Sequence, residues 1–380
     1  MKRFPRNLPE RPGTQGAGLL ALHRLDAAAA AAERLPRSDD SEALHDFRVA
    51  LRRLRVVLRL YRQAFRGRVP RISLKRVRKL ARDTNEARDT EVLEARLKGW
   101  ADDLKPGHLP GADVLRRRLA KGRPEDGRGF IDAAGKEFHS LEGLLRPALL
   151  AVASTEERGP SFGAASAALL RDAGRDLRRR LSAIKTAIDD GPVHKARIAG
   201  KRLRYLLEPF QSRSFLCRKA IGRLKKLQED LGDIHDLNLA VQAVSLCAKK
   251  DVSAWSRGLV EAASLEGTKA GRPSVTLDAS PVPGLARLAA LAGRDRARSF
   301  SRFEERWDGP KAGEFFSGLE AVAGRLSPRP ANALPTGGRG LALQYPGRPG
   351  PPASTAPRRP KAPAAETVPG PTAPEPGPAS

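Results

Sequence analysis

Residues 43–66 read ALHDFRVALRRLRVVLRLYRQAFR, and this stretch decides the fold. On a wheel of about 100° per residue its arginines gather within about 80° of one another. This basic face consists of Arg48, Arg52, Arg55, Arg59 and Arg62, with His45 at its head. The opposite face carries apolar side chains at the spacing of a core-facing helix: Phe47, Leu51, Leu54, Leu58 and Tyr61. Because no acid follows these arginines at i+4, they are not neutralised within the helix, and the face predicts a polyanion site.

The same pattern returns in residues 194–210, HKARIAGKRLRYLLEPF. Aligned on histidine, the basic positions correspond as His45 with His194, Arg48 with Arg197, Arg52 with Lys201, Arg53 with Arg202 and Arg55 with Arg204. A second block, residues 75–92, matches residues 222–239 and pairs Arg78 with Lys225, Lys79 with Lys226, Asp83 with Asp230 and Asp89 with Asp236. The chain is therefore predicted to contain two copies of one helical unit.

These residues resemble the CHAD family, the conserved-histidine α-helical domain. The likeness lies in LHDFRVALRRLR (44–55), HKARIAGKRLRY (194–205) and LQEDLGDIHDL (227–237), and it covers roughly residues 13–325. The resemblance implies an all-α fold of two pseudo-symmetric four-helix-bundle-like repeats around a basic central channel. It also implies non-enzymatic binding of inorganic polyphosphate and association with polyphosphate granules. One departure concerns a turn expected at Leu231-Gly232, where the first copy has Thr84-Asn85; asparagine tolerates the left-handed conformation better than most residues.

Composition limits the classes of partner. The 380 residues contain 70 Lys and Arg against 43 Asp and Glu, a formal net charge of +27. Such an excess predicts an anionic partner: a nucleic acid, polyphosphate or an acidic membrane. Aromatic residues make up only 5% of the chain. Single-strand binders stack bases on aromatic side chains, so this scarcity favours a ligand made of phosphate alone.

The sequence also indicates a compartment. Cys217 and Cys247 form neither a disulfide framework nor a metal-binding spacing. The basic N-terminal residues precede no apolar run, so no signal peptide is expected, and no stretch reaches the roughly 18 apolar residues of a membrane span. We therefore expect a cytoplasmic protein that does not insert into membranes. The sequence carries no signal for a particular oligomeric state.

The sequence predicts a disordered basic arm (1–13), a first repeat (14–155), a second repeat (161–326) and a disordered Pro-rich tail (327–380). Asp39 and Glu42 form a capping pattern before the first basic helix, and Pro192 suits the first turn of the second. Other helices are predicted over 18–35, 73–87, 92–104, 112–121, 130–152, 166–188, 214–231, 237–249, 253–266, 285–307 and 313–326.

The predicted polyphosphate contacts come from both copies, with the histidines as phosphate hydrogen-bond donors and the arginines as forks for two phosphate oxygens. They are His45, Arg48, Arg52, Arg53, Arg55, Arg59, Lys75, Arg78, Lys79, Arg82, His194, Arg197, Lys201, Arg202, Arg204, Lys225 and Lys226. The recurring aspartates stand beside excess cations, so they are interpreted as orienting basic side chains rather than holding a metal. No cofactor is predicted.

Two alternatives stay open at this point. A nucleic-acid-binding protein would use the same basic faces together with the arm and the tail. A phosphatase or polyphosphate-processing enzyme is disfavoured because the sequence offers no metal cluster or nucleophile. Residues 159–163, GPSFG, match G-x-S-x-G, but that motif needs a preceding strand, and Ser161 is predicted to cap a helix instead.

Overall fold

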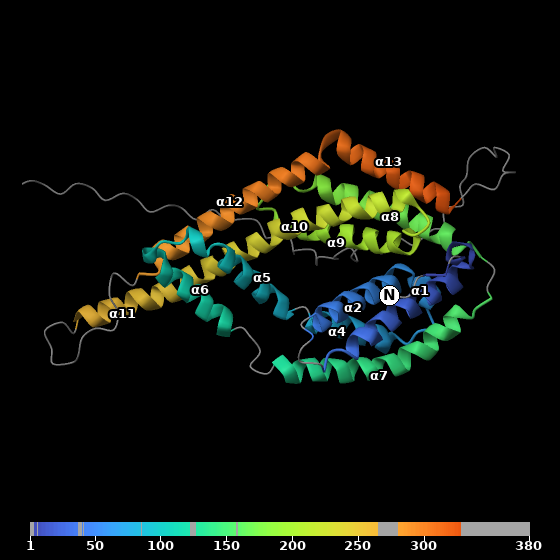
Figure 1. The fold of residues 1–380 in the computed structure, drawn as a ribbon, viewed down its shortest axis with the longest axis horizontal. Helices are drawn as coiled ribbons and strands as arrows, with labels where there is room; N and C mark the ends of the chain where they lie inside the picture. Colours follow the sequence, from blue (N-terminus) through green and yellow to red (C-terminus); the bar gives the residue numbers. More distant parts are fainter. Residues whose placement is uncertain are drawn as a thin grey trace, which may run out of the picture. The chain divides into compact units, whose positions relative to one another are not determined.

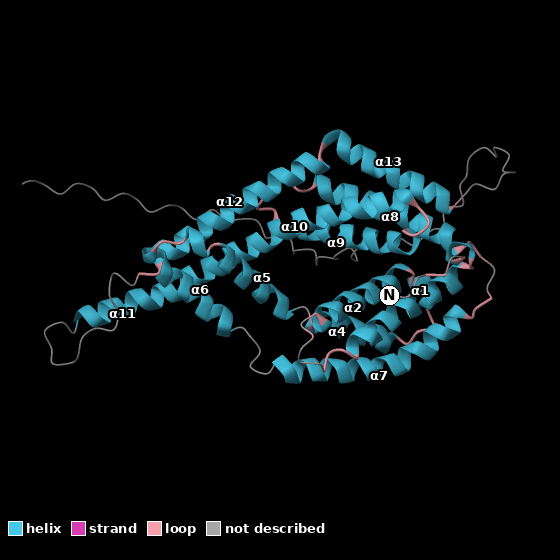
Figure 2. Ribbon diagram, in the orientation of Figure 1, coloured by secondary structure: helices cyan, strands magenta, loops and turns pink. Residues whose placement is uncertain are grey.

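The computed structural model describes residues 4–5, 7–36, 40, 42–84, 86–121, 127–156, 159–264 and 280–327. These residues form helices joined by loops, with no strand among them, so the predicted all-α class is confirmed (Figures 1 and 2). The α-helices are α1 (Gly13–Ala32), α2 (Ala43–Leu60), α3 (Arg62–Phe65), α4 (Arg71–Asp83), α5 (Glu86–Gly99), α6 (Leu109–Lys121), α7 (Gly127–Ala153), α8 (Phe162–Ser182), α9 (Asp190–Leu207), α10 (Phe215–Cys247), α11 (Ser253–Ser264), α12 (Val282–Trp307) and α13 (Gly309–Leu326). Asp39 and the predicted tail from residue 328 onward lie outside the described residues.

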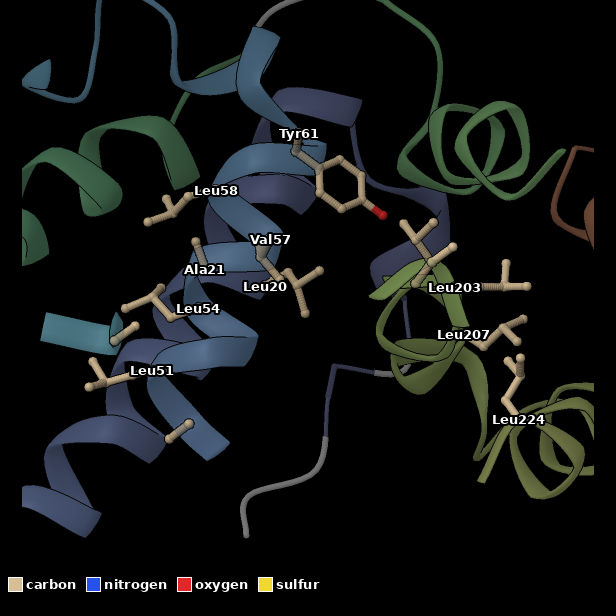
Figure 3. Packing of buried hydrophobic residues seen from close by; sticks show 14 of the residues in the cluster. Leu20, Ala21, Leu51, Leu54, Val57, Leu58, Tyr61, Leu203, Leu207 and Leu224 are labelled. Carbon is tan, nitrogen blue, oxygen red and sulfur yellow. The ribbon is translucent and has the colours of Figure 1, made fainter. Parts of the chain in front are cut away.

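The first group of helices packs α1 against α2 and α7, with α4 across α2 and α7. The predicted core face of α2 is buried: Phe47, Leu51 and Leu54 have no exposed surface. Figure 3 shows Leu51, Leu54, Val57 and Leu58 of α2 beside Leu20 and Ala21 of α1. One apolar face at helical spacing therefore explains why this helix lies where it does.

The second group packs α9 against α8 and α10, and α13 against α8 and α10. Leu203 and Leu207 of α9 and Leu224 of α10 are buried in the same core cluster as the leucines of α2 (Figure 3). Pro192 lies in the first turn of α9, as predicted. Helices α2 and α9, which carry the two matching sequences, are in direct contact. The proposed pseudo-symmetry and central channel remain predictions.

Helix α10 corrects one expectation. The sequence predicts a break at Leu231-Gly232, but α10 runs without interruption from Phe215 to Cys247, 33 residues. The reason is packing: Leu227, Leu231 and Ile234 continue one fully buried apolar face through the glycine. In the first copy the chain does break, since α4 ends at Asp83 and α5 begins at Glu86. Asn85 lies outside the described residues.

A second core cluster joins helices that are far apart in the sequence. Leu97 and Trp100, from the α5 region, and Leu115 of α6 pack with Leu237 of α10 and Leu288 of α12. Thus α5 and α6 belong to the first repeat in sequence but pack on helices of the second repeat. At the closest point α6 meets α12 through glycines, where a Cβ on Gly284 would come within 2.9 Å of the Cα of Gly111.

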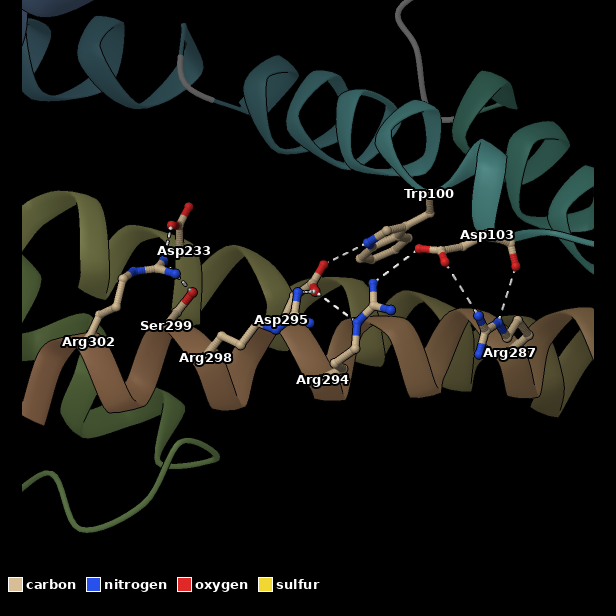
Figure 4. Close-up of polar contacts among 9 residues, drawn as sticks. All are labelled: Trp100, Asp103, Asp233, Arg287, Arg294, Asp295, Arg298, Ser299 and Arg302. Atoms are coloured by element: carbon tan, nitrogen blue, oxygen red, sulfur yellow. Dashed lines mark hydrogen bonds and ion pairs between the residues drawn. The ribbon is translucent and has the colours of Figure 1, made fainter.

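Polar contacts hold the same junction together (Figure 4). Trp100 donates from Nε1 to Asp295 Oδ2 at 2.9 Å, and Arg294 Nη2 lies 3.1 Å from Asp103 Oδ2. Further along α12, Arg302 Nη2 donates to Asp233 Oδ2 at 3.1 Å. The arginines of α12 that appear in Figure 4 are therefore engaged by local carboxylates.

The N-terminal segment differs from the expected disordered arm in its described part. Residues Leu8–Glu10 form a 3₁₀ turn, and Leu8 is buried. The ring of Phe4 stacks on His23 with centroids 4.0 Å apart. Helix α1 begins at Gly13 rather than residue 18, because its start is hydrogen-bonded to the segment just before the second repeat: Gly13 N donates to Pro160 O at 3.0 Å.

Candidate anion-binding site

Hydrogen bonds and ion pairs connect α2 and α9 along their basic faces. Arg52 Nε donates to the hydroxyl oxygen of Tyr205 at 3.1 Å, and Arg53 Nη2 lies 3.1 Å from Glu208 Oε1. Tyr205 is buried, so its hydroxyl acts as a fixed acceptor between the helices. The two matching sequences, separated by about half the domain, therefore meet in one place.

The basic side chains of this region repel one another. Burial lowers the pKa of Arg55, and the neighbouring charges of Arg59, Arg52 and Arg78 lower it further. Arg78 comes from α4, so basic side chains of two helices, α2 and α4, act on one position. A cation that is half-buried among other cations is stabilised by any anion that enters.

The second copy contributes to the same cluster. Burial lowers the pKa of Arg202 on α9, and Arg59 of α2 is the next largest cause, followed by an opposing contribution from Asp176. Arg180 and Arg55 lower it as well. Arginines of α2 and α9 thus lie within electrostatic reach of one another, with Asp176 as the acid that acts on Arg202. We call Arg52, Arg55, Arg59, Arg78 and Arg202 the basic cluster.

A histidine pair lies at the start of α9. The rings of His194 and His235 have centroids 5.0 Å apart, and His235 Nδ1 lies 2.7 Å from Asp190 Oδ1. Burial lowers the pKa of His194 most, followed by the charges of His235 and Arg197. A phosphate at this position would favour the charged imidazole. The counterpart His45 is exposed at the start of α2.

A buried carboxylate holds some of the predicted contacts. Glu208 Oε2 lies 2.8 Å from Arg24 Nη2, and Glu208 Oε1 lies 3.1 Å from Arg53 Nη2 and 3.9 Å from Arg204 Nε. Arg24 itself is 1% exposed. Arg53 and Arg204 are therefore engaged in tying α1, α2 and α9 together, and Arg48 is likewise buried.

The remaining predicted contacts lie on more than one surface. Lys75, Lys79 and Arg82 are exposed on α4, and the carboxylate of Asp83 pairs with Lys79 at 2.8 Å and Arg82 at 3.4 Å. Arg197 and Lys201 are half-buried on α9 beside His194. Lys225 is exposed on α10, whereas Lys226 lines a separate cavity against α12 and α13.

Four residues that act on the predicted contacts were not predicted from the sequence: Arg24, Arg180, Asp176 and Glu208. One signal was present for Glu208. In the histidine alignment it occupies the position of Arg59, so a basic residue in one copy becomes an acid in the other. Arg24 and Arg180 carry no such signal, because they come from helices outside the repeated motif and reach the site only through packing.

Two minor motifs are resolved by the structure. Ser161 caps α8, since its hydroxyl oxygen accepts a hydrogen bond from Ala164 N at 3.2 Å. Cys217 and Cys247 are buried free thiols, and burial raises the pKa of both.

Within the described part of the chain, no group of three or more His, Cys, Asp or Glu side chains is placed to hold a metal ion. None of the described helices combines the length and apolarity needed to cross a membrane.

Residues 20–245, more than half of the chain, match the CHAD domain. The chain belongs to the CHAD domain family. The match includes both histidine-headed helices, α2 and α9, and nearly all of α10.

Solved structures share the fold of this CHAD domain. The crystal structure of the CHAD domain from the plant Ricinus communis matches with a TM-score of 0.51 and 23% identity, covering 74% of this chain and 92% of that chain. PptA from Streptomyces chartreusis matches with a TM-score of 0.54 and 17% identity, covering 76% of this chain and 98% of that chain. At these identities the likeness shows the fold.

Curated relatives come from Mycobacterium tuberculosis. They are "Uncharacterized protein MT2285" (strain CDC 1551 / Oshkosh) and "Uncharacterized protein Rv2226" (strain ATCC 25618 / H37Rv), each 32% identical over 186 residues. The match covers 46% of this chain and 35% of each relative. This CHAD domain protein therefore matches about a third of the length of these relatives.

Proposed function

We propose that this CHAD domain binds inorganic polyphosphate, without catalysis, along the surface where α2 and α9 meet. The single observation that carries the proposal is that the basic faces of α2 and α9 meet: Arg52 Nε donates to the Tyr205 hydroxyl at 3.1 Å, and Arg59 lies within electrostatic reach of Arg202. A linear polyanion relieves the repulsion at several of these positions at once. Guanidinium groups suit the task because each can donate to two phosphate oxygens.

A phosphate polymer fits this surface better than a nucleic acid does. The aromatic side chain at the cluster, Tyr205, is 2% exposed, and its hydroxyl already accepts from Arg52. It therefore offers no open ring for base stacking, on which single-strand binders rely. If the ligand is polyphosphate, the protein is expected in the cytoplasm, associated with polyphosphate granules.

Competition between polyanions tests the proposal. Labelled long-chain polyphosphate, bound to the purified full chain at physiological salt, is challenged with single-stranded DNA, RNA or orthophosphate at equal charge concentration. We expect unlabelled polyphosphate to displace the label at lower concentration than either nucleic acid, because the cluster contacts phosphates and no bases. Displacement by DNA or RNA at equal or lower concentration would instead establish the nucleic-acid-binding alternative.

The affinity for polyphosphate should also depend on pH through His194. In the free protein burial and the neighbouring positive charges lower the pKa of His194, so the imidazole takes up its proton at a lower pH than an ordinary histidine does. Bound phosphate raises that pKa, and binding then takes up a proton in the window between the lowered and the raised value. Affinity should therefore rise as the pH falls through that window, by at most about tenfold per pH unit for one proton. The groups that face His194 are His235, Asp190, Arg197 and Lys201.

Two histidine variants make this pH test specific. His194→Gln should flatten the pH profile of polyphosphate affinity measured by titration. His139→Gln, which changes an exposed histidine on α7, should leave the profile as in the wild type. An unchanged profile in His194→Gln would mean that another group takes up the proton.

A further inference from the structure

A second basic site lies where α10 meets the end of α12 and the start of α13 (Figure 1). A cavity of about 280 Å³ opens there, below the roughly 300–1,000 Å³ of pockets that take drug-sized ligands. Its lining consists of Arg223, Lys226, Arg306, Trp307, Lys311 and Glu314. The cavity is thus small and carries four cationic side chains against one carboxylate.

This cavity is separate from the basic cluster, because none of the five arginines of that cluster is among its lining residues. On α10 the face near α9 is marked by Gly232, where an added Cβ would lie 3.9 Å from Arg197 Nε. Lys226 lies six residues earlier, about 120° around the helix axis from that face. The cavity and the histidine pair therefore lie on different sides of α10, and neither histidine lines the cavity.

Arg223 is held rigidly at the edge of the cavity. Its Nη2 donates to the backbone oxygens of Arg306 at 3.3 Å and Lys311 at 2.7 Å. Its guanidinium carbon lies 5.3 Å from the ring centroid of Trp307 and 5.4 Å from that of Phe315. These contacts use one of its nitrogens and leave Nε and Nη1 as positioned donors. A donor fixed before binding loses little entropy when a ligand arrives.

The other cations are unevenly neutralised. Arg306 Nη1 lies 2.9 Å from the buried carboxylate of Asp230, so its charge is balanced. Lys311 Nζ donates to the backbone oxygen of Glu305 at 3.0 Å and keeps its charge. Lys226 is exposed and has no hydrogen-bond or ion-pair partner among the described residues. After Glu314 and Asp230 are counted, two positive charges remain in excess.

We infer that this cavity binds a small phosphate anion with two or more linked phosphate groups. Arg223 would supply fixed donors for one phosphate, while the ammonium groups of Lys226 and Lys311 neutralise the excess charge. Such an anion can come from free pyrophosphate, from the phosphate tail of a nucleotide or from the end of a polyphosphate chain. Trp307 forms part of the wall and reports on occupancy directly.

The test uses the full chain labelled with 5-fluorotryptophan. The ¹⁹F signal of Trp307 is assigned with Trp307→Phe and followed during titration with pyrophosphate, ATP or long-chain polyphosphate at constant ionic strength. We expect the Trp307 signal to shift and saturate with pyrophosphate. Lys226→Ala with Lys311→Ala should weaken that saturation at least tenfold, whereas Lys219→Ala, at an exposed lysine on the same helix, should leave it unchanged.

The outcomes distinguish the possible ligands from one another, and they also test whether the cavity binds a phosphate anion at all. A saturable shift with pyrophosphate or ATP but not with the polymer supports the site with free phosphates as ligands. A shift with the polymer that the double lysine variant abolishes supports it with chain ends as ligands. No saturable shift, or an equal shift in the double lysine variant, would overturn the proposal. A thermal melt of each variant confirms that it is folded.

Discussion

Glu208→Ala is expected to lower the free energy of unfolding by about 3–5 kcal/mol, the effect typical of removing one partner of a buried ion pair. The side chain of Glu208 is 9% exposed and faces guanidinium groups of three helices. Without the carboxylate, the guanidinium of Arg24, whose side chain is 2% exposed, remains buried with its charge uncompensated. Chemical denaturation with a linear extrapolation measures the change.

The matched control is Glu320→Ala. Glu320 also pairs with an arginine, Arg171 at 3.2 Å, but its side chain is 59% exposed. Exposed pairs contribute about 0–1 kcal/mol, so this variant should unfold almost as the wild type does. If both variants lose the same small amount of stability, the Glu208 contacts do not hold the three helices together.

The triple variant Arg55→Ala, Arg59→Ala, Arg202→Ala should lose about 100-fold in polyphosphate affinity, taking about 1 kcal/mol for each cation that faces a polyanion. The slope of log affinity against log salt should become shallower by about three, one for each lost phosphate contact. The melting temperature should not fall, because the substitutions relieve repulsion among like charges. Affinity titrations at several salt concentrations, with melts of each protein, give all three quantities.

A second triple variant removes the same charge elsewhere. Arg116, Arg171 and Arg175 are already paired with nearby acids on the surface. Their substitution by alanine should change polyphosphate affinity far less than the cluster variant does. Equal losses in the two triple variants would mean that net charge, not the α2–α9 surface, attracts the polymer. Unfolding of the cluster variant would mean that its arginines form a structural network.

The sequence predicted those features of the fold that depend on a local pattern. The core face and the basic face of α2 follow from periodicity alone, and the all-α class follows from the same signal. The partner of Arg53 could not be predicted, because Glu208 is 155 residues away and reaches it only through the packing of α9 on α2. Periodicity also could not decide whether Gly232 breaks a helix, since the apolar contacts that continue α10 through it come from other helices.

The placement of α5 and α6 has a consequence for synthesis on the ribosome. Leu97, Trp100 and Leu115 are made early, but the surfaces of α10 and α12 that bury them are made more than a hundred residues later. A nascent chain that ends between the repeats must keep these apolar side chains exposed or covered by a chaperone. The second core can close only after α12 has emerged, so folding of this chain is completed from its C-terminal side.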